Sequence, residues 1–282
     1  MRVKVYVESA FCKDNSGGNR AGIVLFNDKL NEIQKKEISA KLGYAETAFV
    51  TKSDKADFKI EYFTPSEEVP LCGHATVATF ALMLEQGMLD RKAYTFETRA
   101  GVLSIGIEGT MVVMEQTKPQ YFEILGKMEI ADCFDVEEVS GLYPIQIVST
   151  GLRDIIVPIK SESALAGLRP EFNKISEISS KYDTIGMHAF VLDGERIVCR
   201  NFAPLYDVPE ESATGTANCA LASYLYNQGI LRKKEYYIEQ GYSLNSPSEI
   251  IVRINEENGE INRVFVSGRG RFVEATEVDI AD

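Results

Sequence analysis

The stretch GHATVATFALMLEQGML at residues 73–89 occurs a second time, as GTANCALASYLYNQGIL at residues 215–231. The two copies align without a gap, 142 residues apart, and six of their seventeen positions are identical. Residues 75–84 and 217–226 carry no charged side chain, which predicts in each copy a helix that is buried on all sides. Each helix is expected to end at a glycine in the C′ position, Gly87 or Gly229. One repeat at so long a spacing indicates a duplicated domain rather than a solenoid.

Shorter matches on both sides of the two helices extend the repeat. They pair Ala48-Phe49-Val50 with Ala189-Phe190-Val191, Phe63-Thr64-Pro65 with Phe202-Ala203-Pro204, Tyr94 with Tyr236, and Glu97 with Glu239. We therefore predict two domains, residues 1–118 and 119–282. The acidic end, residues 274–282, is expected to be either a tail or a final strand that returns to the first domain. Duplicated domains place equivalent loops on either side of a cleft, where small ligands commonly bind.

Segments rich in β-branched and aromatic residues predict strands in both halves of the chain. The first half contains Arg2–Val7, Gly22–Phe26, Thr47–Thr51, Phe58–Phe63, Leu103–Glu108 and Met111–Glu115, and the second half contains Ile145–Ser149, Asp154–Ile159, Ala189–Leu192, Arg196–Phe202, Tyr236–Gln240, Glu249–Ile254 and Arg263–Ser267. Polar-faced helices are expected at Asn31–Lys41, with Ile33 and Ile38 inward, and at Glu171–Lys181. The predicted fold class is α+β, with two pseudo-symmetric domains that each wrap a mostly antiparallel sheet around a central helix.

Composition narrows the class of partner. The chain has 282 residues, of which 45% are hydrophobic and 26% are charged, and its net charge is −12 at pH 7. This charge argues against nucleic acid, which is bound mainly through Lys and Arg contacts to phosphate. No apolar run reaches the roughly 18 residues that a membrane span requires, and Met1–Val7 alternates like a strand rather than a signal peptide. A cytoplasmic protein that binds no membrane is expected.

The five cysteines are scattered, and there are only two histidines. Neither a CxxC nor an HExxH motif occurs, so no structural zinc site is expected. Cysteines that are odd in number and unclustered are typical of reduced intracellular thiols.

The start of each repeated helix is a candidate anion site. Gly73 and Gly215 permit close approach of a ligand to the backbone. The first N–H groups of a helix have no partner within the helix and carry the positive end of its dipole, so two such starts can bind an anion without Lys or Arg. The alternative is that both glycines serve close packing only.

Three further residues are candidates for acid–base chemistry. Glu46 precedes a predicted strand, and its repeat counterpart is Met187, so the duplicated framework does not require a charge there; burial would raise its pKa toward neutrality. His74 lies in the first helical turn, where the dipole favours neutral imidazole. Glu211, in a segment that only the second copy carries, can complete a pair with either residue. The structural alternatives are an exposed strand glutamate, a packed histidine and a carboxylate that balances the helix dipole.

Cys72 is a weaker candidate. A helix start can lower the pKa of a thiol, but a two-base racemase needs a second thiol, and the equivalent position holds Thr214. Packing is therefore favoured for Cys72, and a structural role is favoured for His188.

Together these segments resemble the phenazine-biosynthesis isomerase family (PhzF-like), within the diaminopimelate epimerase superfamily. The motifs that carry the resemblance are Gly17-Gly18-Asn19, Glu46-Thr47-Ala48-Phe49-Val50, Leu71-Cys72-Gly73-His74-Ala75-Thr76 and the region from Phe202-Ala203-Pro204 to Pro209-Glu210-Glu211-Ser212-Ala213-Thr214-Gly215-Thr216. The resemblance implies an active site between two similar domains, a homodimer, and no metal, nucleotide or flavin. This chain departs from the family's pattern at two places. It has Glu211-Ser212 where the family has Asp-Pro, and it has Arg20 where the family has a proline.

The resemblance also implies roles for individual residues. A glutamate matching Glu46 moves a proton within a dihydro-hydroxyanthranilate ring in the characterised enzyme, a histidine matches His74, and an aspartate matches Glu211. Substrate contacts match Asn19, Gly73, Gly215 and Thr216. The sequence thus favours a cofactor-independent isomerase of a small, anionic, cyclic metabolite. The alternatives are a Cys72-dependent amino-acid epimerase or racemase, and a binding protein for small acids without turnover.

Overall fold

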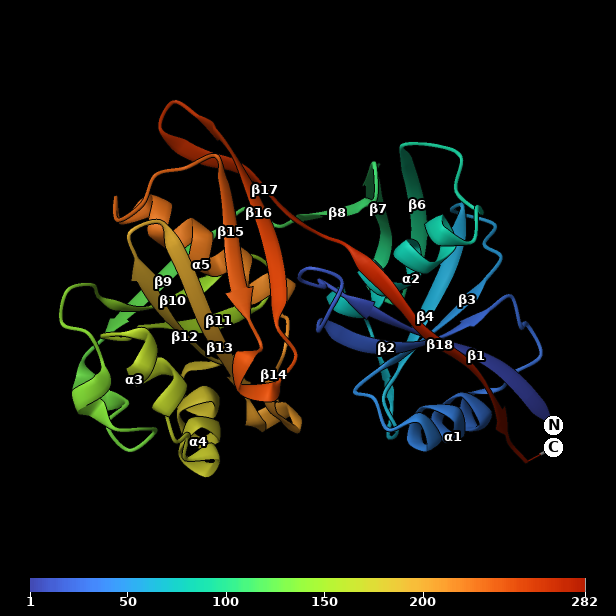
Figure 1. Cartoon of the computed structure of the whole chain (residues 1–282), viewed down its shortest axis with the longest axis horizontal. Helices are drawn as coiled ribbons and strands as arrows, with labels where there is room; N and C mark the ends of the chain where they lie inside the picture. The colour runs from blue at the N-terminus through green and yellow to red at the C-terminus, as the bar shows by residue number, and fades with distance from the viewer. Residues whose placement is uncertain (282) are drawn as a thin grey trace. The chain divides into compact units, whose positions relative to one another are not determined.

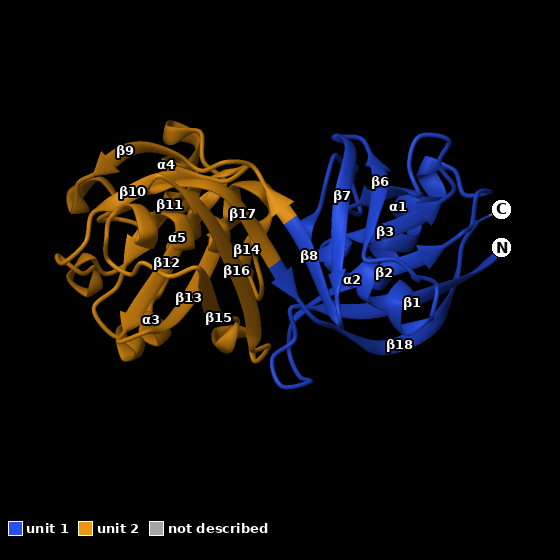
Figure 2. Cartoon of the chain, turned by 90° about the horizontal axis from the view of Figure 1, so that it is seen from above, with its two compact units in different colours: residues 1–114, 267–282 blue, residues 115–266 orange. Residues whose placement is uncertain are grey.

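The computed structural model describes residues 1–281, and the chain forms two compact units (Figure 2). Unit 1 contains residues 1–114 and the end of the chain from residue 267, and unit 2 contains residues 115–266. The chain passes between the units within the strands β8 (Met111–Gln116) and β17 (Glu260–Gly268). The sequence-based division at residue 118 lies near the first of these passages. Asp282, the last residue of the predicted tail, lies outside the described residues.

Unit 1 is a sheet with two helices. Its strands besides β8 are β1 (Arg2–Ala10), β2 (Asn19–Leu25), β3 (Thr47–Thr51), β4 (Phe58–Phe63), β5 (Glu68–Val69), β6 (Ala93–Thr98), β7 (Gly101–Glu108) and β18 (Gly270–Asp279), and its helices are α1 (Glu32–Leu42) and α2 (Gly73–Glu85). The strands pair in the order β18, β1, β2, β3, β4, β6, β7 and β8, with β5 also paired to β4. Only the pairs β2–β3 and β4–β6 are parallel among them.

Unit 2 repeats this order. Its strands besides β17 are β9 (Gln120–Leu125), β10 (Ile145–Ser149), β11 (Arg153–Pro158), β12 (Gly186–Asp193), β13 (Arg196–Ala203), β14 (Val208–Glu211), β15 (Glu235–Gln240) and β16 (Ser248–Glu257), and its α-helices are α3 (Glu162–Gly167), α4 (Phe172–Tyr182) and α5 (Gly215–Asn227). The order is β9, β10, β11, β12, β13, β15 and β16, and the parallel pairs are β11–β12 and β13–β15. These are the pairs equivalent to the parallel pairs of unit 1.

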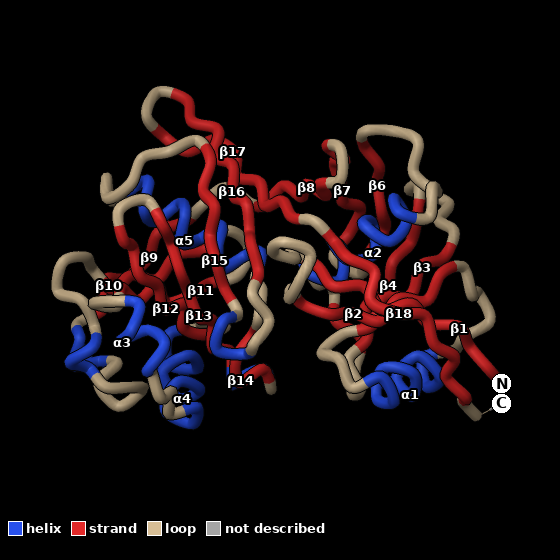
Figure 3. Tube along the Cα trace, in the orientation of Figure 1, coloured by secondary structure: helices blue, strands red, loops and turns tan. Residues whose placement is uncertain are grey.

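A central helix lies against the strands of each unit, α2 in unit 1 and α5 in unit 2 (Figures 1 and 3). Each has 13 residues, of which ten are buried. Helix α2 packs on β1, β2, β3 and β18, and α5 packs on β10, β11 and β16. Gly87 and Gly229 follow the helices with φ of 68° in both, as expected for a left-handed C′ glycine. The predicted buried helices are therefore confirmed.

The two surface helices also form, one residue later than predicted. Asn31 caps α1 in a capping box, accepting from Gln34 N at 3.0 Å while Gln34 Oε1 accepts from Asn31 N. The prediction that Ile33 faces inward is wrong, because its side chain is 78% exposed whereas Ile38 is fully buried. Five residues correspond to about 140° around a helix, so the two isoleucines lie on different faces.

The last described segment is a strand rather than a tail. β18 pairs antiparallel with the whole of β1, from Arg2 opposite Asp279 to Ala10 opposite Gly270. The N-terminal amine donates to Ile280 O at 2.7 Å, and the two ends of the chain lie side by side (Figure 1). β9 begins directly after the predicted division between residues 118 and 119, and it pairs with β10.

Candidate functional site

The first turn of α2 is fixed by a buried chain of hydroxyl groups. Thr76 Oγ1 donates to the carbonyl of Cys72, the N-cap residue, at 2.7 Å, and the Thr76 N–H donates to the same oxygen at 3.0 Å. The Tyr62 hydroxyl on β4 lies 2.6 Å from Thr76 Oγ1. Because all three residues are buried, the turn that carries Gly73 and His74 is held rigidly against the sheet.

Glu46 and His74 meet at this turn. Glu46 immediately precedes β3, and its carbonyl accepts from Gly22 N on β2 at 3.4 Å. His74 Nε2 lies 3.4 Å from Glu46 Oε2, and their side chains are 5% and 18% exposed. Two groups that can each take or release a proton therefore lie within contact of each other, largely shielded from solvent. The structure thus brings Glu46, Gly73 and His74 together.

The thiol of Cys72 is a third member of this group. Its Sγ lies 3.5 Å from Nδ1 and 4.0 Å from Nε2 of His74. Burial, with a further contribution from the charge of Glu46, raises the pKa of the Cys72 thiol to about 11. The expected lowering of its pKa by the helix start is therefore outweighed, and the thiol is protonated near neutral pH.

Asn19 begins β2, after a tight turn that requires glycine. Gly18 has φ of +83°, and a Cβ there would lie 2.5 Å from both Ala10 O and Ser9 Oγ. Ser9 Oγ donates to the Gly17 carbonyl at 2.6 Å. Because β2 and β3 run parallel, Asn19 lies at the end of the sheet at which Glu46 enters β3.

Unit 2 builds the equivalent turn with different side chains. Asn218 Nδ2 donates to the carbonyl of Thr214, the N-cap residue of α5, at 2.8 Å, as Thr76 does for Cys72 in unit 1. Thr150 Oγ1 donates to Thr216 O at 3.1 Å. Gly215 is buried at the start of α5, and Thr216 is half-buried.

Glu211 ends β14 and is held by the same turn. Its Oε2 accepts from Thr214 Oγ1 at 2.5 Å, and its carbonyl accepts from Gln240 Nε2 at 2.7 Å. Glu211, Gly215 and Thr216 are thus gathered at the start of α5. The pairing of Glu211 with Glu46 or His74 stays a prediction.

Unit 2 has methionine at the position equivalent to Glu46, and its own histidine, His188, is not the counterpart of His74. Met187 lies in the apolar core of unit 2 and is fully buried. His188 lies between Asn201 and Asn218, with Nδ1 2.9 Å and Nε2 3.2 Å from their amide oxygens. Burial lowers the pKa of His188 to about 4, so this imidazole is neutral at physiological pH, in keeping with a structural role.

Asp154 is a residue that the sequence pattern did not single out. It lies at the start of β11 and is 2% exposed. Burial, together with the nearby charge of Glu211, raises the pKa of Asp154 to about 8. An acidic residue directly before the apolar run Ile155-Ile156-Val157 was the available signal.

The starts of both central helices share an electrostatic feature. Neither α2 nor α5 has an acidic residue in its first turn, and neither N-cap side chain accepts from the helix. A Cβ added to Gly73 would meet no atom within 4 Å. A ligand atom beside Gly73 would thus meet no steric hindrance on that side, where the helix dipole favours an anion.

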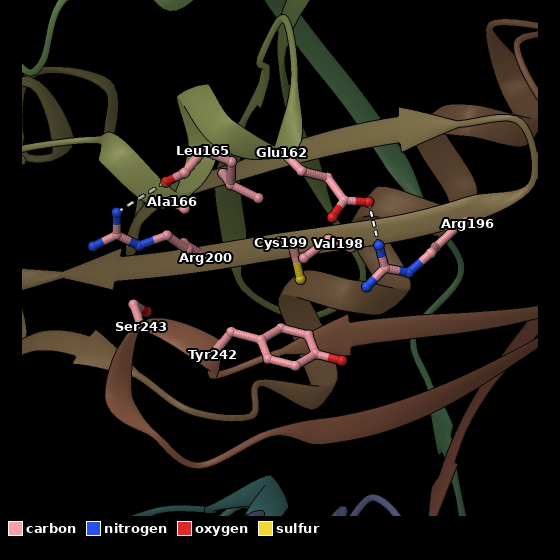
Figure 4. Close-up of a pocket in the computed structure, with 9 residues that line it drawn as sticks. All are labelled: Glu162, Leu165, Ala166, Arg196, Val198, Cys199, Arg200, Tyr242 and Ser243. Carbon is pink, nitrogen blue, oxygen red and sulfur yellow. Dashed lines mark hydrogen bonds and ion pairs between the residues drawn. The ribbon is translucent and has the colours of Figure 1, made fainter.

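A cavity of about 330 Å³ lies elsewhere in unit 2 (Figure 4). None of the predicted site residues lines it. Its two guanidinium groups are already paired, Arg196 with Glu162 and Glu239, and Arg200 with Glu210 at 2.8 Å and with the carbonyls of Leu165 and Leu168. The cavity therefore offers no unneutralised cation for an acidic substrate, and the chemistry favours the helix starts.

Within residues 1–281, no helix has both the length and the apolar character that a membrane crossing requires.

The family model described as phenazine biosynthesis-like protein matches residues 8–276. An uncharacterised isomerase of Bacillus subtilis, YfhB, is 32% identical over 94% of this chain and 94% of its own length. A trans-2,3-dihydro-3-hydroxyanthranilate isomerase of Pseudomonas chlororaphis is 29% identical over 93% of this chain and 94% of its own length.

The fold has a close counterpart among solved structures. The crystal structure of a PhzF-family phenazine biosynthesis protein from Bacillus anthracis superposes with a TM-score of 0.90 at 29% identity, over 99% of this chain and 100% of the other. The predicted α+β fold class and the family resemblance are confirmed.

Proposed function

Because this chain belongs to the phenazine biosynthesis-like protein family and is an isomerase, we propose that it moves a proton between two carbons of a small, cyclic carboxylic acid. Glu46 takes the proton from one carbon and returns it to another. The substrate carboxylate binds to backbone N–H groups at the helix starts. The reaction needs only side chains of this chain as acid and base.

The observation that carries this proposal is the contact between Glu46 and His74. Their reactive atoms lie 3.4 Å apart in a site that excludes most solvent. Exclusion of most water favours proton transfer between the substrate and the carboxyl group, while the partial exposure of Glu46 lets an abstracted proton exchange with solvent before a proton returns to the substrate. The duplicated frame of unit 2 has no such pair, because Met187 and Thr216 occupy the equivalent positions.

Each acid–base group has a distinct role in the proposal. Glu46 is the base in the first half of the reaction and the acid in the second, since one carboxyl group can serve both directions. His74 contacts the same carboxylate and orients it, and it stabilises the charge that appears when the proton leaves carbon. Glu211, held by Thr214, is proposed as the third acid–base contact.

The helix starts supply the binding contacts. The uncapped first turn of α2 presents N–H groups at Gly73, where no side chain intervenes. Gly215 and Thr216 offer the equivalent groups of α5. An anion is favoured at such positions because of the orientation of the peptide dipoles. Asn19 is proposed as a further polar contact to the substrate.

A thiol-dependent epimerase is less well supported. Its base would be Cys72, whose pKa is raised to about 11, and a thiol must be ionised to act as a base. The position that would hold a second thiol is Thr214, whose hydroxyl is engaged with Glu211.

The test uses trans-2,3-dihydro-3-hydroxyanthranilate as the first candidate substrate, since the relative from Pseudomonas chlororaphis is named for it, followed by a panel of small cyclic carboxylic acids. Incubation in deuterium oxide should incorporate deuterium into any substrate that is turned over. The variant Glu46→Gln should fold normally and lose roughly 100-fold or more in rate and exchange.

The matched control is Glu32→Gln, the same substitution at an exposed position of unit 1, which should leave the rate unchanged. Undiminished deuterium incorporation by Glu46→Gln would show that another group moves the proton. Turnover of a panel member in place of the first candidate would keep the proposed chemistry and change only the substrate.

A further inference from the structure

Three side chains of different metal-binding types converge at the start of α2. Glu46, Cys72 and His74 each offer one ligand atom, and these atoms lie within 4.8 Å of one another. They come from two segments, the residue before β3 and the N-terminal turn of α2. Both the thiol and the imidazole are buried, and Glu46 is half-buried.

The separations approach those around a tetrahedral metal ion. With Zn–S near 2.3 Å and Zn–N and Zn–O near 2.0–2.1 Å, tetrahedral ligands stand roughly 3.6 Å apart for sulfur and nitrogen and roughly 3.4 Å apart for nitrogen and oxygen. Here His74 Nε2 lies 4.0 Å from Cys72 Sγ and 3.4 Å from Glu46 Oε2. To bind one ion, Cys72 Sγ must move a few tenths of an ångström closer to Nε2, and the sulfur and the Glu46 carboxylate, which lie within 4.8 Å of each other, must close to roughly 3.6 Å.

The ligand set selects the kind of ion. Thiolate, imidazole and carboxylate together suit Zn²⁺, whereas Mg²⁺ and Ca²⁺ prefer oxygen ligands alone. One thiolate, one carboxylate and a neutral imidazole also cancel the charge of a divalent ion. Neutralisation matters here because an uncompensated charge in a largely buried site is costly.

We propose that Glu46, Cys72 and His74 form an inhibitory Zn²⁺ site, with the fourth position open to water or substrate. The Cys72 thiol releases its proton to solvent when sulfur binds the ion. The inhibition rests on the proposed function, because the ion occupies the two groups that move the substrate proton. Cys72 thereby supplies the ligand that holds the zinc ion against Glu46 and His74.

Binding is tested first, without reference to activity. Wild-type protein is titrated with Zn²⁺ against a chromophoric chelator, and one ion per chain is expected. Cys72→Ser should weaken zinc binding at least about tenfold. Cys12→Ser is the matched control: Cys12 is another buried thiol of unit 1, and its Sγ donates to Ser9 O at 3.1 Å. It should leave the affinity unchanged.

Inhibition is tested next, relative to the uninhibited rate of each variant. Zn²⁺ should inhibit the wild type and Cys12→Ser, and a chelator should restore the rate, while equal Mg²⁺ has no effect. Cys72→Ser should require at least about tenfold more Zn²⁺. Equal zinc affinity of Cys72→Ser and wild type overturns the site. Stoichiometric, Cys72-dependent binding in a protein that turns over no substrate would overturn the proposed function and leave the zinc site standing.

Discussion

At the scale of single residues, Thr76 connects the core of unit 1 to the turn that carries His74. Its hydroxyl contacts the Tyr62 hydroxyl at 2.6 Å and donates to the Cys72 carbonyl at 2.7 Å. All of these groups are buried. Removal of the Thr76 hydroxyl therefore leaves a buried phenol without its hydrogen-bond partner, which costs more than loss of the hydrogen bond itself.

We expect Thr76→Val to lower the free energy of unfolding by about 1–3 kcal/mol, measured by urea denaturation. Thr79→Val is the matched control in the same helix, and it should cost less, because within residues 1–281 the Thr79 hydroxyl hydrogen-bonds to the Ala75 carbonyl alone. Adding Tyr62→Phe to Thr76→Val should cost less than the sum of the two single changes. Equal losses for Thr76→Val and Thr79→Val would contradict the proposed link.

The proposed acid–base residues, Glu46 and His74, could be selected from the sequence because the repeat is broken at them. Glu46 stands opposite Met187 and His74 opposite Thr216, so the duplicated framework requires neither a carboxylate nor an imidazole at these positions. Their 3.4 Å separation was not predictable, because it depends on how β3 enters the sheet beside α2. Asp154 was missed since its burial arises from strand pairing with β10 and β12, which a single segment does not reveal.

At the scale of elements, the start of α2 combines a helix terminus with an open approach. Gly73 does not have a positive φ, and a Cβ there would meet no protein atom within 4 Å. Alanine is also a better helix former than glycine. Replacement of Gly73 by alanine should therefore be tolerated by the fold, and its methyl group should occupy the space in which the substrate carboxylate is proposed to bind.

We expect Gly73→Ala to keep the melting temperature of the wild type and to raise KM roughly tenfold, with a smaller change in kcat, because one to two kcal/mol of binding is lost. Gly167→Ala is the control: Gly167 lies in α3, and a Cβ there also meets no atom within 4 Å. Steady-state kinetics with whichever substrate the deuterium-exchange test identifies measures KM and kcat for both variants. An unchanged KM for Gly73→Ala would place the carboxylate elsewhere.

Elements were predictable where one physical signal dominates. The uncharged runs of α2 and α5, with glycine after each, identify buried helices because no other element buries all sides of so long an apolar segment. β9 was missed because its residues Gln120–Leu125 are only partly buried and follow Pro119, so neither burial pattern nor composition separates them from a linker. Ile33 was misplaced because a short polar helix has a narrow apolar face.

At the scale of the whole molecule, the duplication reproduces details beyond the fold. Tyr94 Oη accepts from Arg91 N at 2.6 Å in unit 1, and Tyr236 Oη accepts from Lys233 N at 3.2 Å in unit 2. These pairs lie at the repeat offset of 142 residues. The same strand order with the same two parallel pairs recurs in each unit, so the sequence repeat fixes topology as well as helices.

Each unit also contains a buried carboxyl group whose neutral form is favoured. In unit 1, burial and then the charge of Glu85 raise the pKa of Glu8 to about 8, and neither of its carboxyl oxygens has a hydrogen-bond partner among the described residues. In unit 2, burial and then the charge of Glu211 raise the pKa of Asp154 to about 8. Both groups ionise at a much lower pH in the unfolded chain.

A carboxyl group with a raised pKa in the folded state stabilises the fold most fully at acidic pH, below its unfolded pKa, and this stabilisation is lost as the pH rises toward 8. We therefore expect the melting temperature, followed by calorimetry, to fall by at least roughly 5 °C between pH 6 and pH 9. Glu8→Gln in unit 1 and Asp154→Asn in unit 2 should each make the melting temperature fall less steeply with pH, because an amide does not ionise. This holds whatever the two changes do to the stability at acidic pH. Glu277→Gln, at an exposed position of β18, is the control. The variant that combines Glu8→Gln with Asp154→Asn is the decisive comparison. If its melting temperature falls as steeply with pH as that of the wild type, other groups govern the loss of stability at alkaline pH.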